Sequence, residues 1–155
     1  MTRIALDSNI LVYLAGVSRT AADEDKIGKI RVMTTRLAPT ANLIAPAQAL
    51  GELFVVLRRG GASADEARAI VIEFAEAFGT SASEARTMLA AADLVVDHKL
   101  QFWDALIVTA AADAGCTILL SEDMQHGFVA RGLTIINPLA EPAHAKLTAL
   151  LSEPG

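Results

Sequence analysis

The sequence predicts an α/β fold with a mostly parallel central sheet flanked by helices. Short apolar runs recur along the chain, and most of them are separated by segments with helical periodicity or helix-start signals. Strands separated by helices need crossover connections, which give a parallel sheet. The 155 residues have the length of one ordinary domain. We therefore expect a single domain over 1–155, with its core at about 3–138 and a short C-terminal tail at 139–155.

The N-terminal third supplies two predicted strands. Residues 4–6 form an apolar run before the turn-prone Asp7-Ser8-Asn9, which indicates a buried strand. Residues 10–14 then suit a short helical turn, and residues 23–37 have apolar side chains at helical spacing. Residues 42–45 form the second expected strand.

Start and stop signals predict three helices in the middle of the chain. Pro46 suits the first position of a helix that runs to residue 59 and stops at two glycines. Two Ser-x-x-Glu capping boxes open the next two helices, which end near residues 78 and 96. The two boxes are Ser63 with Glu66 and Ser81 with Glu84.

The C-terminal third repeats the strand and helix alternation. Residues 102–114 predict an apolar helix that Gly115 closes, and residues 117–120 and 133–136 predict two short strands. Residues 141–155 suggest a short surface helix, to which we assign no function.

Three acidic residues lie alone in apolar segments. Asp7 is the only charged residue between Ile4 and Ser18. Glu52 is the only one between Pro46 and Leu57, and Asp104 is the only one between Leu100 and Ala112. Helices this apolar are expected to be largely buried. A buried carboxylate is normally paired, protonated or bound to a metal, and no lysine or arginine lies within these runs.

The positions of the acids point to a common site. Asp7 follows the first predicted strand, and Asp123 follows the strand at 117–120. Ligands of parallel α/β sheets bind outside the carboxyl ends of the strands. Asp104 in the first turn of its helix and Glu52 two turns into its own could reach the same edge. Clustered carboxylates repel one another, and hard cations such as Mg²⁺ or Mn²⁺ relieve that repulsion. The set therefore predicts a site for metal-dependent phosphoryl chemistry.

Each acid also has a simpler interpretation. Asp7 can cap the following turn, Asp104 can complement a helix dipole, and Asp123 can belong to a surface turn. Glu52 lies in mid-helix, where capping does not explain it. Taken together, the four favour the metal site. Neither residue type nor spacing chooses between Asp123 and its neighbour Glu122.

Charge and cysteine usage limit the function classes. A net charge of −5 excludes a protein that grips nucleic acid through a broad basic face. Without the four proposed ligands, 14 acidic residues face 13 basic ones, so most of the acidic excess lies in the proposed site. The single Cys116 cannot form an internal disulfide, and no apolar stretch reaches the length of a membrane span. We expect a cytoplasmic protein without a membrane partner.

Four segments in this order and spacing resemble the PIN-domain ribonucleases, specifically the VapC-type toxins of toxin–antitoxin pairs. The resemblance extends from Ile4 to about Pro138. Its segments are Leu6-Asp7-Ser8-Asn9, Glu52 in its apolar helix, Phe102-Trp103-Asp104-Ala105-Leu106-Ile107, and Leu119-Leu120-Ser121-Glu122-Asp123-Met124-Gln125-His126-Gly127.

The resemblance implies a three-layer PIN-like fold and a residue-by-residue assignment of the site. It places Mg²⁺ or Mn²⁺ on Asp7, Glu52, Asp104 and Asp123 as the catalytic and metal-binding residues, with Asn9 and Ser121 in support. The implied reaction cleaves single-stranded RNA with a metal-activated water and leaves a 5′-phosphate and a 3′-hydroxyl. The resemblance further implies a homodimer and a cognate VapB-type antitoxin that inhibits the enzyme.

Two other functions compete with this hypothesis. A haloacid-dehalogenase-type phosphatase also begins with an Asp after its first strand, but it uses a second Asp two residues on, where this chain has Asn9. A non-catalytic PIN-like module would bind RNA or a partner without cleaving. A receiver domain needs an acidic pair before its first loop and a late lysine, and we find neither.

Overall fold

The computed structural model describes residues 1–154, which form one six-stranded sheet with helices on both faces. The strand order is β3-β2-β1-β4-β6-β5, and every neighbouring pair is parallel except β5 with β6. This arrangement confirms the predicted mostly parallel α/β fold. The strands are β1 (Thr2–Leu6), β2 (Ala41–Pro46), β3 (Gly79–Ser81), β4 (Ile118–Leu120), β5 (Val129–Ala130) and β6 (Leu133–Ile136).

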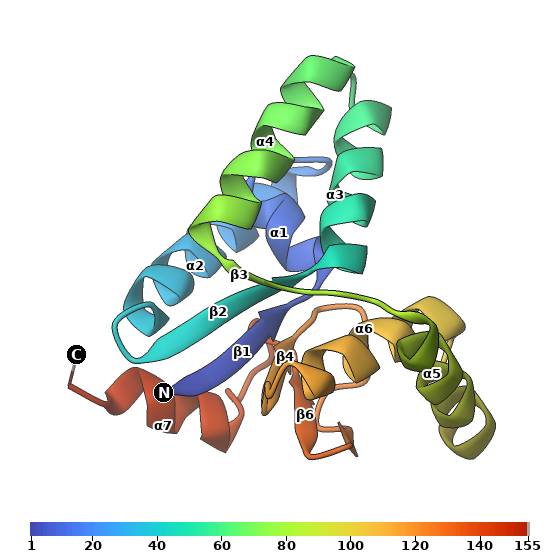
Figure 1. The fold of residues 1–155 in the computed structure, drawn as a ribbon. Coiled ribbons are helices and arrows are strands. Elements are labelled where there is room, and N and C mark those ends of the chain that lie inside the picture. The colour runs from blue at the N-terminus through green and yellow to red at the C-terminus, as the bar shows by residue number, and fades with distance from the viewer. Residues whose placement is uncertain (155) are drawn as a thin grey trace.

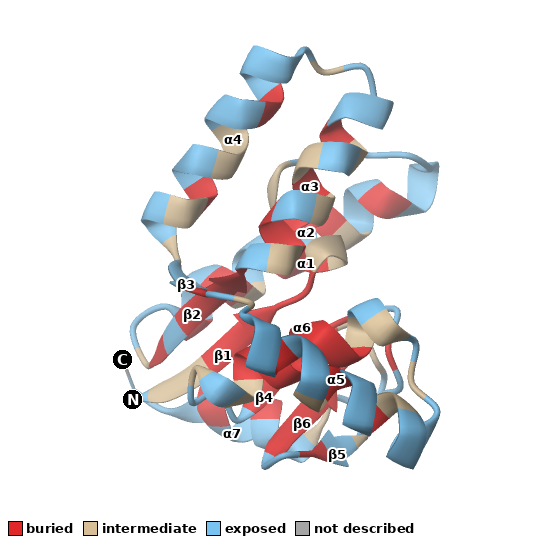
Figure 2. Ribbon diagram, turned by 45° about the vertical axis from the view of Figure 1, so that its right-hand side comes forward, coloured by how far each residue is buried: buried red, intermediate tan, exposed pale blue. Residues whose placement is uncertain are grey.

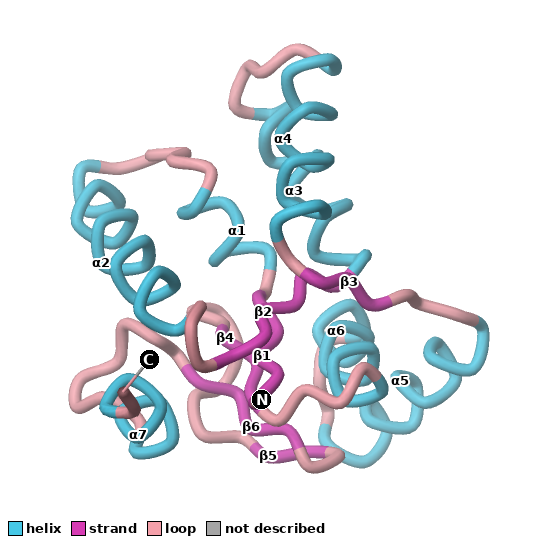
Figure 3. The backbone as a smooth tube through the Cα atoms, turned by 60° about the vertical axis from the view of Figure 1, so that its left-hand side comes forward, coloured by secondary structure: helices cyan, strands magenta, loops and turns pink. Residues whose placement is uncertain are grey.

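Over residues 1–154, seven helices connect and cover these strands. The helices α5 and α6 lie on one face of the sheet, and α2 and α7 lie on the other (Figures 1 and 3). The α3–α4 pair extends beyond the edge at which β1 and β2 end. The helices are α1 (Ser8–Leu14), α2 (Ala21–Leu37), α3 (Ala47–Arg59), α4 (Ala64–Ala77), α5 (Ala85–His98), α6 (Phe102–Asp113) and α7 (Ala145–Ser152).

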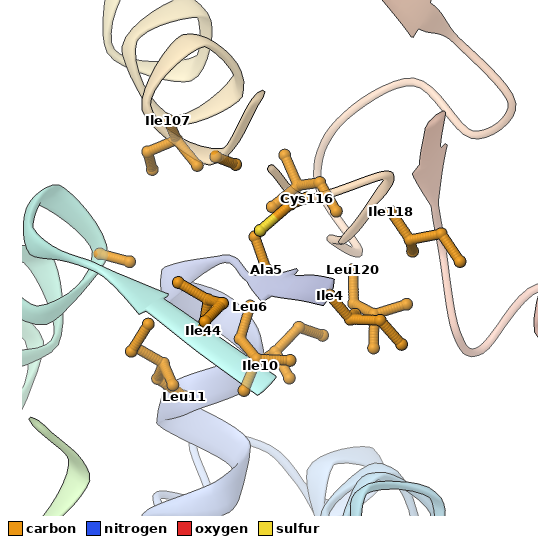
Figure 4. Close-up of a cluster of buried hydrophobic side chains, with 14 of the residues drawn as sticks. Ile4, Ala5, Leu6, Ile10, Leu11, Ile44, Ile107, Cys116, Ile118 and Leu120 are labelled. Carbon is orange, nitrogen blue, oxygen red and sulfur yellow. The ribbon is translucent and has the colours of Figure 1, made fainter. Parts of the chain in front are cut away.

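The core is built on the central strands β1 and β4. Ile4, Leu6 and Leu120 are fully or almost fully buried among aliphatic side chains from the helices (Figure 4). The helix α6 has buried residues on every side over 105–111, whereas α4 and α5 are mostly exposed (Figure 2). The helix that carries Asp104 is therefore a central element, as its apolar sequence predicts.

Near residue 80 one predicted helix end is confirmed, and the predicted start of the next helix is wrong. Residues 79–81 form the edge strand β3, so the preceding helix ends at Ala77 with Phe78 as its C-cap. The expected box of Ser81 with Glu84 does not form. The helix α5 begins instead at Ala85, where the Thr87 hydroxyl accepts a hydrogen bond from the Glu84 N–H at 3.0 Å.

Smaller differences concern strand and helix ends. The box of Ser63 with Glu66 forms as predicted, with both hydrogen bonds at 3.1 Å. Pro46 is the last residue of β2 and the N-cap of α3 rather than its first residue. Two short strands, β3 and β5, were not predicted, because neither contains an extended apolar run.

The C-terminal tail is more than a surface helix. Two leucines of α7, Leu147 and Leu150, are buried, and α7 contacts α2. The tail therefore covers part of one sheet face. Among residues 1–154, no helix is long and apolar enough to cross a membrane.

Candidate active site

The four acids that the sequence singles out come from four elements near one edge of the sheet. Asp7 follows β1, and Asp123 lies three residues beyond β4, its parallel neighbour. The chain leaves β1 towards β2 on one side and reaches β4 on the other, so the order of the strands reverses here. Such a switch point is where open α/β sheets bind their ligands. Glu52 on α3 and Asp104 on α6 approach this point from the helices.

Asp7 is the buried centre of a hydrogen-bond network. One carboxylate oxygen accepts from the Ser8 N–H at 2.7 Å, so Asp7 caps α1. The other oxygen accepts from the Ser121 hydroxyl at 2.7 Å and from the Asn9 amide at 3.1 Å. Asp7 therefore caps the following helix, which was the simpler interpretation of the sequence. It is also close enough to Glu52 and Asp104 for their charges to act on it.

Burial raises the pKa of Asp7 to about 6, because desolvation disfavours the charged form. The hydrogen bonds from Ser121 and Ser8 oppose this rise, and charge repulsion from Glu52 and Asp104 adds to it. The pKa of Asp104 is also raised, first by burial and then by repulsion from Glu52 and Asp123. The four carboxylates thus act on one another electrostatically, although no direct hydrogen bond joins any two of them within residues 1–154.

The helical acids have fewer partners than Asp7. The side chain of Gln48, one turn before Glu52, donates to Glu52 Oε1 at 3.2 Å. Asp104 lies in the first turn of α6, where the helix dipole favours a negative charge. Its own N–H donates to the Gln101 side chain, which caps the helix. Both carboxylates are half-buried.

The neighbouring side chains of Glu122 and Asp123 have different partners in the structure. Asn9 Nδ2 donates to Asp123 Oδ2 at 3.2 Å, which ties Asp123 to the Asp7 network. Glu122 makes an ion pair with Lys26 at 2.9 Å and accepts from the Tyr13 hydroxyl at 2.5 Å. Glu122 is therefore occupied by α1 and α2, and Asp123 is the residue whose charge reaches Asp104.

Asn9 and Ser121 connect the strand ends. The Asn9 amide contacts Asp7, Ser121 and Asp123, and its oxygen accepts from the Glu122 N–H at 3.1 Å. The fully buried Ser121 hydroxyl accepts in turn from the Met124 N–H at 3.2 Å. Two adjacent loops are thus fixed to each other by one amide and one hydroxyl.

The chemistry of the donor set fits a hard divalent cation. All four groups are oxygen donors, and no lysine or arginine within 1–154 forms an ion pair with any of them. Charge repulsion from the other acids helps to raise the pKa of Asp7 and of Asp104. Over the same residues, no three His, Cys, Asp or Glu side chains meet closely enough to form a metal site as they stand.

Four supporting residues were not predicted. Gln48 lies four residues before Glu52, and this helical spacing is a signal that sequence reasoning could have used. Tyr13, Lys26 and Glu122 interact across sequence separations of about a hundred residues, so no local pattern reveals their association.

The fold and the acidic edge define a doubly wound α/β protein with an oxygen-donor site at its switch point. A comparison with protein-family models matches residues 4–131 to the PIN domain. The chain belongs to the PIN domain family. The comparison with curated protein sequences found no match.

Solved structures share this fold at low sequence identity. A VapBC2 complex from Rickettsia felis, bound to a promoter DNA fragment, matches with a TM-score of 0.65 and 14% identity, over 86% of this chain and 97% of that one. The VapC20 toxin from Mycobacterium tuberculosis, described as cleaving the sarcin-ricin loop, matches with a TM-score of 0.60 and 17% identity, over 77% and 91%. A toxin–antitoxin complex from Klebsiella pneumoniae matches with a TM-score of 0.62 and 15% identity, over 87% of this chain and 97% of that one. At these identities the likeness establishes the fold.

Proposed function

We propose that this chain is a metal-dependent endoribonuclease of the VapC toxin type, with Mg²⁺ or Mn²⁺ held by Asp7, Glu52, Asp104 and Asp123. The observation that carries the proposal is the set of four carboxylates, from four elements, that repel one another without a cationic partner within 1–154. The PIN family match and the likeness to VapC structures support it. We infer single-stranded RNA as the substrate.

Bound at these carboxylates, the metal would lower the pKa of a water and stabilise charge on the phosphate. The chain's own residues position the ligands. Ser121 and Asn9 orient the Asp7 carboxylate, and Asn9 holds Asp123 beside it. Gln48 orients Glu52 from within α3. Asn9 donates to three oxygens, a structural role that gives no support to a phosphatase needing an acid at this position.

The partners and location follow from the same proposal. Neighbouring structures are complexes with antitoxins, which supports a VapB-type protein as the inhibitor. We further propose a homodimer and a cytoplasmic location. The free Cys116 is buried and is compatible with a reducing compartment.

The central test compares wild-type protein with Asp7→Asn. We expect the wild type to bind Mn²⁺ in calorimetry and to cleave single-stranded RNA with Mg²⁺. Replacing Asp7 removes one ligand charge, and activity should fall by at least about 10³-fold, since metal stabilisation of the transition state supplies several kcal/mol. Induced expression of the variant should no longer arrest growth.

Asp113→Asn is the matched control, because Asp113 pairs with Arg131 on the surface and is not among the four acids. It should retain wild-type cleavage. Tight RNA binding without Mn²⁺ affinity would favour the non-catalytic module, and a fully active Asp7→Asn would refute the metal-site assignment.

A further inference from the structure

We propose that the cavity beside Glu52 is a nucleotide subsite, in which Trp103 stacks on a base and Arg59 contacts a phosphate. The inference rests on the proposed function and adds the place where the neighbouring nucleotide of the RNA binds. The cavity has a volume of about 750 Å³, which is ample for one nucleotide. Among its lining residues are Gln48, Glu52, Val55, Arg59, Ser83 and Trp103.

The cavity is continuous with the candidate site. Glu52 lines both, together with its partner Gln48, and Ser8 lies directly after Asp7. An RNA strand whose scissile phosphate lies at the carboxylates therefore has an adjacent nucleotide within reach of this cavity. The space is bounded by α3 on one side and by the first turn of α6 on the other.

Trp103 provides an aromatic surface at the cavity wall. It precedes Asp104 directly, and 47% of its surface is exposed, unlike the buried residues that follow it on α6. Phe102 packs against it edge to face, with ring centroids 5.0 Å apart and planes at 75°, and this contact restrains the indole. Exposed aromatic rings held in this way are stacking platforms for single-stranded nucleic acid.

Two polar groups that line the cavity lack partners within 1–154. Arg59 makes no ion pair or side-chain hydrogen bond within 1–154, whereas its neighbour Arg58 donates to the Ala62 carbonyl. The Ser83 hydroxyl is screened from solvent and also has no hydrogen-bond partner among the described residues. A nucleotide supplies what each group lacks: a phosphate for the guanidinium, and polar base or sugar atoms for the hydroxyl. A second protein copy would cover Val55 and Trp103 but would give no role to the positively charged Arg59.

The sequence contains one tryptophan, so the intrinsic fluorescence of the whole chain reports on this cavity. The probe is adenosine 5′-monophosphate, which has no internucleotide bond to cleave, titrated into the full chain with Mg²⁺. We expect saturable quenching of Trp103. Arg59→Gln should weaken the binding about three- to tenfold, because it loses a charge-assisted contact at an exposed position. Arg68 on α4 lies outside the cavity, so Arg68→Gln should leave the binding of the nucleotide unchanged.

Kinetics give the second measurement. Trp103→Ala should raise the KM for single-stranded RNA about fivefold or more, the effect of losing one stacked base, with a smaller change in kcat. Val96→Ala on α5, 79% exposed and away from the cavity, is the control and should keep the wild-type KM. Circular dichroism of each variant checks that it is folded.

The outcomes distinguish the subsite from the enzyme. RNA cleavage without quenching by the nucleotide refutes the subsite and leaves the nuclease intact. Quenching that depends on Arg59, without any RNA cleavage, supports the subsite and refutes the nuclease. Emission that shifts to the blue with rising protein concentration and ignores the nucleotide shows that a second copy covers Trp103, and this overturns the proposal.

Discussion

The candidate site has a buried half and an open half, and they are built differently. In the buried half, Asp7 is 4% exposed and accepts hydrogen bonds from Ser8, Asn9 and Ser121. In the open half, Glu52 and Asp104 are half-buried on helices, and Gln48 is the one side chain within 1–154 that donates to either carboxylate. The strand ends thus fix one carboxylate, whereas the helices present two with few restraints.

The two halves disfavour the charged carboxylates for different reasons. In the buried half the main reason is desolvation, which is the largest cause of the raised pKa of Asp7. The open half adds charge repulsion, because Glu52 raises the pKa of both Asp7 and Asp104. Both effects weaken when a cation binds, so the metal-free protein should be destabilised at neutral pH by its own site.

The largest expected effect tests the buried half in metal-free protein. The pKa of Asp7 is about 6 in the folded state and 3.8 for an aspartate in water, so the native state binds the proton more tightly than the unfolded state does. Stability is therefore lost as pH rises from about 4 to 7. Relative to Asp7→Asn, the wild type should lose up to about 3 kcal/mol over this window. Urea unfolding in EDTA at several pH values measures the difference, and saturating Mg²⁺ should reduce it.

Asp23→Asn is a control of opposite sign. Asp23 accepts from the Arg19 and Thr20 N–H groups at the start of α2, and these bonds lower its pKa. The wild type should gain stability relative to this variant as pH rises through the acidic range. If the free energy of unfolding changed equally with pH in the wild type and in Asp7→Asn, burial would not raise the pKa of Asp7.

The next effect concerns the hydroxyl that stabilises Asp7. In the wild type, the 2.7 Å hydrogen bond from Ser121 lowers the pKa of Asp7. Ser121→Ala removes this bond, so the pKa of Asp7 should rise further and the acidic limb of the activity profile should move to higher pH. Loss of a residue that orients a ligand should weaken Mg²⁺ binding about 10- to 100-fold. Calorimetry and a pH–rate profile provide the two measurements.

Thr109→Val is the matched control for Ser121→Ala. Thr109 is also fully buried, and its hydroxyl donates to the Ala105 carbonyl within α6, with no contact to Asp7. It should change stability while leaving Mg²⁺ affinity and the pH profile in place. If both variants weakened Mg²⁺ equally, Ser121 would have only a structural role.

Sequence reasoning was most successful where a residue stood out from its own neighbours. Asp7 could be placed because it follows an apolar strand, and Glu52 and Asp104 because each is the only charged residue in an apolar run, over 46–57 and 100–112. The strand at 117–120 indicated the pair Glu122 and Asp123, and the family resemblance chose Asp123. Parallel pairing of β1 with β4 then brings the two strand ends together. The positions of these acids were thus predictable, whereas their hydrogen-bond partners were not, apart from the helical pair of Gln48 with Glu52.

The region around residue 80 shows why the rest was missed. Residues 79–81 have a helix-stop glycine and a capping pattern, but pairing with β2 draws them into the sheet. Gly79 lies so close to β2 that an added Cβ would be 2.6 Å from the Ile44 side chain. Local propensity was overridden by a tertiary contact whose partner lies 35 residues earlier in the chain.

The smallest expected effect tests whether the open half is restrained at all. Gln48→Met keeps the side-chain volume but removes the donor to Glu52 Oε1, a single 3.2 Å bond at a half-buried position. Because such a bond contributes about 0.5–1 kcal/mol net, Mn²⁺ binding should weaken only about two- to fivefold. Gln48→Glu puts a like charge one turn from Glu52, and once the cation is removed this repulsion should destabilise the fold further. Calorimetry with Mn²⁺ and unfolding in EDTA separate the two variants. A loss in Gln48→Met as large as in Ser121→Ala would mean that the open half is as preorganised as the buried one.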